Sequence, residues 1–108
     1  MGAFNTLRTA ITCPCGRKFD VAIQFKFGDT FQHDYILGDE LKWGGNDVGR
    51  RGVSHVVLDG VAVAPCSICA RELEFYIHVE KDRISRVELA DGRYNFINTH
   101  ATFLVVRE

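Results

Sequence analysis

Residues 18–27 read KFDVAIQFKF, and apolar and polar side chains alternate along almost the whole stretch. The positions on one side of this alternation are all apolar: Phe19, Val21, Ile23, Phe25 and Phe27. Because successive side chains of a β-strand point to opposite faces, a period of two predicts a strand with one buried face. The stretch therefore indicates a β domain.

The same period returns in residues 71–82, RELEFYIHVEKD. One face of this second predicted strand carries Leu73, Phe75, Ile77 and Val79. The opposite face, which we expect to point outward, carries Glu72, Glu74, Tyr76 and His78. The pattern therefore predicts a second strand with one buried face.

Three further segments are rich in strand-forming residues. Residues 83–99, RISRVELADGRYNFINT, predict a hairpin that turns at Asp91-Gly92, because these residue types accept the positive φ of a tight turn. Residues 101–108 predict a last strand. In residues 53–64, VSHVVLDGVAVA, Asp59-Gly60 marks either a turn or a bulge within one long strand.

No segment shows a sustained apolar period of 3.6 residues with helix caps, and the best helix candidate is a short turn around residues 38–43, GDELKW. The chain has 108 residues, of which 46% are hydrophobic and 25% charged. Those values are typical of one soluble domain. We predict a mainly β fold: one small antiparallel β domain spanning residues 1–108.

The overall charge and the absence of long apolar runs exclude several classes of protein. The formal net charge is −1, which does not favour a general nucleic-acid binder. The first residues lack the basic start and apolar run of a secretory signal, and no stretch approaches the roughly 18 apolar residues that span a bilayer. We therefore expect a cytoplasmic protein that does not associate with membranes.

The four cysteines form two clusters about fifty residues apart, CPC at residues 13–15 and CSIC at residues 66–69. Each cluster lies in a predicted loop with a proline in or beside it and a predicted strand after it. Such turns point two thiolates to one side, and two of them facing each other make a tetrahedral four-sulfur shell that suits Zn²⁺. The predicted zinc ligands are Cys13, Cys15, Cys66 and Cys69. Four thiolates leave no open coordination position, so this zinc is expected to be structural.

Three other interpretations of the cysteines remain open. Two disulfides would need an oxidising compartment. The pair Cys66 and Cys69 has the spacing of a thioredoxin-like redox motif, although that motif normally begins a helix and a strand is predicted here. An iron–sulfur cluster also accepts four thiolates.

The CPCG and CSIC knuckles, each followed by a strand, resemble the zinc-ribbon class. Residues 23–45, IQFKFGDTFQHDYILGDELKWGG, look like small bacterial cytosolic ribbon proteins, some of which are similar to immunity proteins of toxin–antitoxin competition systems. The resemblance implies a protein whose partner is a toxin.

Residues 28–49 form a glycine-rich acidic insertion with five acids, five glycines and one lysine. Acidic side chains around aromatic residues suit a basic protein partner, because charge steers the encounter and the rings anchor the contact. The predicted partner-binding residues are Asp34, Tyr35, Asp39, Glu40 and Trp43. The alternative interpretation is a solvated insertion whose apolar residues simply cap the core.

These observations predict a non-catalytic protein-binding module with structural zinc, and an immunity protein that neutralises a basic toxin is the most specific version. The alternative is a nucleic-acid-binding zinc ribbon that uses Arg50, Arg51 and the basic residues of 81–86, with aromatic rings for stacking. No serine elbow, phosphate-binding loop or HExxH pair is present, so we expect no enzyme. A hydrolase that uses His33 and nearby acids is a third, weaker hypothesis.

Overall fold

The computed structural model describes residues 4–66, 70, 72–94, 96 and 102–108. Within that part of the chain the regular structure consists of strands and contains no helix. The strands, in chain order, are β1 (Asn5–Thr12), β2 (Lys18–Phe25), β3 (Gly28–Asp29), β4 (Asp34–Tyr35), β5 (Asp47–Val48), β6 (His55–Ala62), β7 (Glu74–Glu80), β8 (Arg83–Leu89) and β9 (Phe103–Arg107). The mainly β prediction is confirmed.

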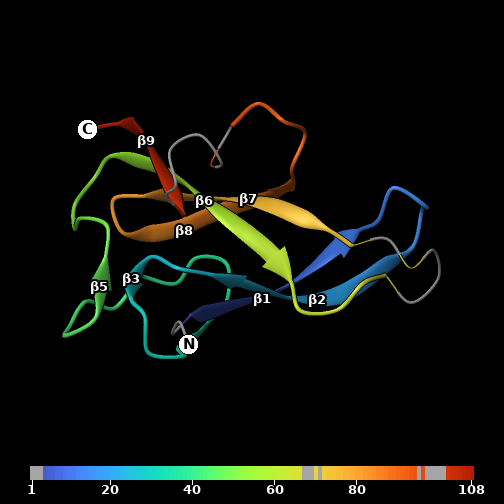
Figure 1. Cartoon of the computed structure of the whole chain (residues 1–108), viewed down its shortest axis with the longest axis horizontal. Helices are drawn as coiled ribbons and strands as arrows, with labels where there is room; N and C mark the ends of the chain where they lie inside the picture. The colour runs from blue at the N-terminus through green and yellow to red at the C-terminus, as the bar shows by residue number, and fades with distance from the viewer. Residues whose placement is uncertain (1–3, 67–69, 71, 95, 97–101) are drawn as a thin grey trace.

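A seven-stranded sheet has the order β4-β1-β2-β6-β7-β8, with β9 paired to β6 (Figure 1). The pairs β1–β2, β2–β6, β6–β7, β6–β9 and β7–β8 are antiparallel, as predicted. The short strand β4 instead runs parallel to β1, so the sheet is mixed. Strands β3 and β5 form a separate two-stranded sheet within the glycine-rich insertion.

The segment 34–41 connects the two edges of the large sheet. Its first residues pair with β1 as β4, and Glu40 then forms a bridge with Arg83 at the start of β8. Backbone hydrogen bonds from Gly38 N to Ile84 O (2.8 Å) and from Ile84 N to Asp39 O (2.9 Å) continue this contact. The predicted helical turn at residues 38–43 is wrong, because this backbone is engaged with a strand edge.

The core lies between the strands that the alternating patterns predicted. The predicted apolar faces of β2 and β7 both contribute, for example Ile23, Phe25, Phe75 and Ile77, each at most 2% exposed. Strand β6 runs unbroken through Asp59-Gly60, so this dipeptide is not a turn. A Cβ atom at Gly60 would lie 2.7 Å from Cγ2 of Ile23, so only glycine lets the neighbouring side chains pack this closely.

The second face of β7 is also buried, which corrects the prediction that Tyr76 and His78 point into solvent. Tyr76 is 3% exposed and His78 is 0% exposed. The segment after β8 covers them: the Tyr76 hydroxyl accepts hydrogen bonds from the backbone N of Gly92 (2.8 Å) and of Tyr94 (3.2 Å). Alternation within β7 carries no information about a segment that packs on its outer face.

The hairpin involving β8 also differs from the prediction. Strand β8 pairs with the preceding β7 and turns at Lys81-Asp82, where both residues have positive φ (50° and 67°). The described residues that follow Asp91-Gly92 form no strand: they begin the covering segment, where Asp91 Oδ1 accepts from Arg93 N (3.0 Å). Residues 95 and 97–99 of the predicted second arm lie outside the described residues. Among the described residues, no helix is long and apolar enough to span a membrane.

Candidate metal centre

The first cysteine cluster lies in the tight loop that connects β1 to β2. Cys13 N donates to Arg17 O (2.8 Å), and Gly16 N donates to Cys13 O (2.8 Å). Pro14 has the fixed φ that favours the start of such a turn, and Gly16 takes the positive φ of 95° that ends it. The loop thus returns the chain into β2 and holds Cys13 and Cys15 close together.

The second cluster follows β6. Val63 N donates to Ala22 O (2.9 Å), which keeps the chain beside β2 as it leaves the sheet. Ala70 N then donates to Cys66 O (2.9 Å), and Ala70 has a φ of 57°. A glycine is the more usual residue at this place in a knuckle, because glycine has no Cβ and adopts a left-handed backbone without strain.

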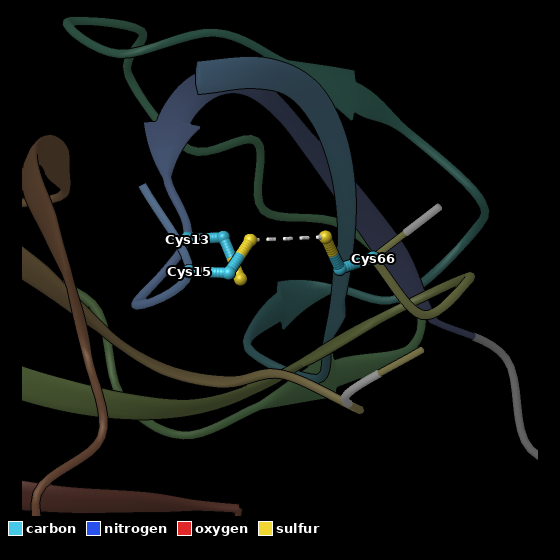
Figure 2. Close-up of side chains that lie close together, drawn as sticks. All are labelled: Cys13, Cys15 and Cys66. Carbon is cyan, nitrogen blue, oxygen red and sulfur yellow. Dashed lines mark hydrogen bonds between the residues drawn. The ribbon is translucent and has the colours of Figure 1, made fainter. Parts of the chain in front are cut away.

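Three sulfur atoms from these two loops converge (Figure 2). The Sγ atoms of Cys13, Cys15 and Cys66 all lie within 4.8 Å of one another, and Cys15 Sγ and Cys66 Sγ are 3.8 Å apart. Cys13 and Cys66 are each 1% exposed, whereas Cys15 is exposed. Sequence reasoning correctly predicted that the two clusters would meet.

The sulfur geometry fits a metal ion. Four thiolates at about 2.3 Å around a tetrahedral zinc ion lie about 3.8 Å from one another, the separation of Cys15 and Cys66. A disulfide requires about 2.05 Å, so these two sulfurs are not bonded to each other. Three cysteines in one cluster can therefore hold a thiophilic metal ion. The predicted fourth ligand, Cys69, lies outside the described residues.

No protein-family model matches this chain, and no curated protein and no solved structure matches it either. The zinc-ribbon and immunity resemblances therefore rest on the sequence alone.

The predicted partner-binding residues have different environments. Asp34 is exposed and lies 3.4 Å from Arg8 in a surface ion pair. Tyr35 is only 3% exposed: its ring packs near Phe25, and its hydroxyl accepts from Lys42 N (3.1 Å). Burial raises the pKa of Tyr35. Tyr35 thus belongs to the core and offers a partner almost no area.

Asp39, Glu40 and Trp43 complete the predicted set. Asp39 Oδ2 accepts from Ile36 N (2.9 Å) and so holds its own loop, while the Glu40 side chain is exposed. Trp43 is half-buried, with its ring edge-on to Phe27 at 5.5 Å. Within residues 34–43 the most exposed apolar residue is Ile36, at 60%, beside Leu37 at 41%; earlier in the insertion, Phe31 is 68% exposed.

Further acids of the insertion also stabilise the loop from within. Asp29 accepts from His33 Nε2 (3.1 Å) and from Asn46 N (3.1 Å), and these two hydrogen bonds lower the pKa of Asp29. Asp47 Oδ1 accepts from Gly44 N (2.8 Å). His33, the residue named in the hydrolase hypothesis, is therefore paired within the insertion.

Sequence reasoning missed a hydrogen-bonded chain on the outer face of β7. His78 lies between His55 and Glu88, with His55 Nε2 to His78 Nδ1 at 2.9 Å and His78 Nε2 to Glu88 Oε2 at 2.5 Å. Glu88 also pairs with Arg93 of the covering segment. The sequence shows His55 and His78 in two predicted strands, but it does not show that these strands are neighbours in the sheet. The contact between the two rings could therefore not be predicted.

Proposed function

We propose that this chain is a metal-stabilised β domain that binds a protein partner and has no catalytic role. The convergence of Cys13, Cys15 and Cys66 from two loops is the observation that carries the metal site. Zn²⁺ is the ion we propose, because clustered cysteine thiolates, two of them buried, suit it best. The sequence supplies Cys69, three residues after Cys66, as the fourth thiolate.

The proposed role of the metal is structural. The two loops lie at the ends of β1, β2 and β6, so an ion shared between them would join strands that are distant in sequence. Four thiolates leave no coordination position for water, and the ion would therefore not activate a nucleophile. Small β domains gain from such a staple, since their cores are modest.

Elemental analysis and Co²⁺ substitution test the metal site. We expect about one zinc ion per chain, and we expect Co²⁺ to give the visible spectrum of a tetrahedral thiolate site. Cys69→Ser should change that spectrum, which tests the fourth ligand. A protein that purifies without metal and takes up no Co²⁺ would overturn the proposal.

The proposed partner surface is the apolar tip formed by Ile36 and Leu37, with Asp34 and Glu40 beside it. Two exposed apolar side chains together are suited to bury area against a partner, and the exposed Glu40 carboxylate favours a basic one. The tip is held in place, because Asp39 accepts from Ile36 N and Arg83 donates to Gly38 O (2.7 Å). A prearranged loop loses less entropy on binding.

In the most specific version of this proposal the partner is a basic toxin and the chain is its immunity protein. The product of the neighbouring gene is the first partner to test, by calorimetry and by co-expression. Ile36→Ser with Leu37→Ser should weaken binding and abolish protection from toxicity. The matched control is Val63→Ser, because Val63 is equally exposed, at 59%, but lies elsewhere.

Two outcomes decide between this proposal and the nucleic-acid alternative. If the tip variants and the Val63→Ser control bind the partner equally, the tip is not the contact surface. If the chain instead binds DNA or RNA at low salt with steep salt dependence, the nucleic-acid alternative replaces the protein-binding role.

A further inference from the structure

A hollow lies on the outer face of the sheet and is lined by residues of β6, β7 and the segment that follows β8. Figure 1 shows the described backbone after β8 in orange. The volume of the hollow is about 380 Å³, within the range that accommodates a small ligand or one long side chain. Its walls are formed by Asp59, Glu74, Tyr76, Ala90, Gly92, Tyr94 and Phe96. It is distinct from both the cysteine cluster and the Ile36–Leu37 tip.

Strand register places two carboxylates beside one aromatic ring. Asp59 of β6 lies directly opposite Tyr76 of β7. Glu74 is two residues before Tyr76 on the same strand and therefore shares its face. The two acids thus border the hollow at neighbouring positions of the sheet.

The aromatic walls are held in place by hydrogen bonds. The buried Tyr76 hydroxyl accepts from Gly92 N and Tyr94 N, which fixes the covering segment on the sheet. The ring of Tyr94 stands perpendicular to that of Tyr76, with centroids 4.9 Å apart and planes at 88°. The hollow is therefore a prearranged feature of the fold.

The two carboxylates lack compensating charge. Among the described residues, neither Asp59 nor Glu74 has a side-chain hydrogen bond or an ion pair. Burial, and then the negative charge of Glu74, raise the pKa of Asp59. A positive group in the hollow would relieve both effects.

Among the described residues, the arginine that lies beside these rings is already paired with acids. The Arg93 guanidinium lies 5.4 Å from the Tyr94 ring centroid and 6.0 Å from that of Tyr76. It pairs with Asp91 (2.9 Å) and with Glu88, so it does not balance the charge of Asp59 and Glu74. Its guanidinium lies within the distance of a cation–π contact with both rings, so a positive group is compatible with this aromatic surface.

We propose that this hollow binds an organic cation, a guanidinium or alkylammonium group, between the Asp59 and Glu74 carboxylates and the half-buried Tyr94 ring. The carboxylates accept charge-assisted hydrogen bonds from the N–H groups, and the Tyr94 ring contacts the cation and its alkyl stem. An organic cation suits the hollow better than a metal ion, because Asp59 and Glu74 have aromatic neighbours and are not part of a cluster of three or more metal-ligating side chains among the described residues. An anion would be repelled by both acids.

The test is a titration of the ¹⁵N-labelled, metal-loaded protein with N-acetylarginine amide and with butylammonium, followed by NMR. We expect saturable shifts of the Gly92 and Tyr94 amides. N-acetylnorleucine amide, which is similar in size but neutral, should give none. Asp59→Asn should weaken binding about tenfold or more, because it removes one charged hydrogen-bond partner. Glu74→Gln, at an exposed position, should weaken it as well.

Glu80→Gln is the matched control, because it removes the same charge at the other end of β7 and should leave the affinity unchanged. Unshifted amides at β1 and β2 in the Asp59→Asn spectrum establish that the variant folds. Absence of saturable shifts, equal shifts with the neutral amide, or unchanged affinity of both acid variants would overturn the proposal. If an arginine-containing peptide binds more tightly than N-acetylarginine amide, the natural source of the cation is a protein side chain. If the peptide and N-acetylarginine amide bind with equal affinity, the natural ligand is a small free amine.

Discussion

Cys15 Sγ and Cys66 Sγ lie 3.8 Å apart although 51 residues separate them in the sequence. The first belongs to the β1–β2 loop and the second follows β6, and these elements are brought together because β2 pairs with β6 through Ile23↔Ala62. The sheet itself therefore brings the two loops together. A metal ion bound there would stabilise a contact that the fold already forms.

Removal of the metal is expected to destabilise the domain. An ion that binds only the folded chain adds about 4 kcal/mol when its free concentration is about 1,000 times its dissociation constant. A chelator should therefore lower the free energy of unfolding of the native chain by a comparable amount. Cys66→Ser should lower both metal content and stability, since Cys66 is 1% exposed and a serine hydroxyl is a poor zinc ligand.

Chemical unfolding with and without chelator, together with elemental analysis, checks this. The Cys66→Ser variant is the control for the native chain. Because it has already lost a metal ligand, a chelator should lower its free energy of unfolding little further. An equal response to chelator in both proteins would contradict the prediction.

Gly60→Ala is expected to destabilise the sheet. The added Cβ would lie 2.7 Å from Ile23 Cγ2 and 3.1 Å from Ile77 Cδ1, and both side chains are fully buried. Overpacking of this kind costs about 1–3 kcal/mol. Urea unfolding measures it, with Gly45→Ala as the control because no atom lies within 4 Å of a Cβ at that position. Equal stability of the two variants would contradict the close packing at Gly60.

Sequence patterns predicted the strands whose apolar residues alternate with polar ones. Alternation in residues 18–27 and 73–79 identified β2 and the inner face of β7, and the spacing of the cysteines predicted that their two loops would meet. These features could be predicted because each depends on residues close together in the chain, or on the chemical preference of one residue type.

The features that the sequence did not reveal depend on contacts between distant segments. The Lys81-Asp82 turn has no glycine or asparagine to mark it, and Asp82 Oδ1 instead accepts from Gly52 N (2.9 Å). Burial of His78 depends on the segment that folds over β7, and burial of Tyr35 depends on the parallel pairing of β4 with β1. Periodicity within one strand cannot detect what covers its outer face.

Ala70→Gly is expected to stabilise the second knuckle. The left-handed backbone at a φ of 57° costs a residue with a Cβ about 1–2 kcal/mol, while glycine's greater freedom in the unfolded chain costs about 0.5–1 kcal/mol. The net gain should be about 0.5–1 kcal/mol, measured by thermal unfolding of the metal-loaded protein. Ala22→Gly, within β2, should instead destabilise the chain by a similar amount. If both variants lose stability equally, the strain at Ala70 is not relieved by glycine.

The stability of the domain is expected to fall as the pH drops below about 6.5, the ordinary pKa of histidine. Burial, and then the neighbouring His78 ring, lower the pKa of His55 in the folded protein. Arg107 and Arg86 also lower it, whereas Glu80 acts in the opposite direction. Below the ordinary value the unfolded chain therefore binds a proton that the folded chain does not, and this difference favours unfolding.

His55→Gln separates this effect from protonation of the cysteines, because both proteins keep the same cysteine cluster. The glutamine amide can still donate a hydrogen bond to His78 Nδ1, so the chain from residue 55 to Glu88 is retained. Urea unfolding at about pH 7.5 and about pH 5.5 should show a larger loss of stability in the native chain than in the variant. An equal loss in both proteins would mean that His55 does not contribute to the acid sensitivity of the fold.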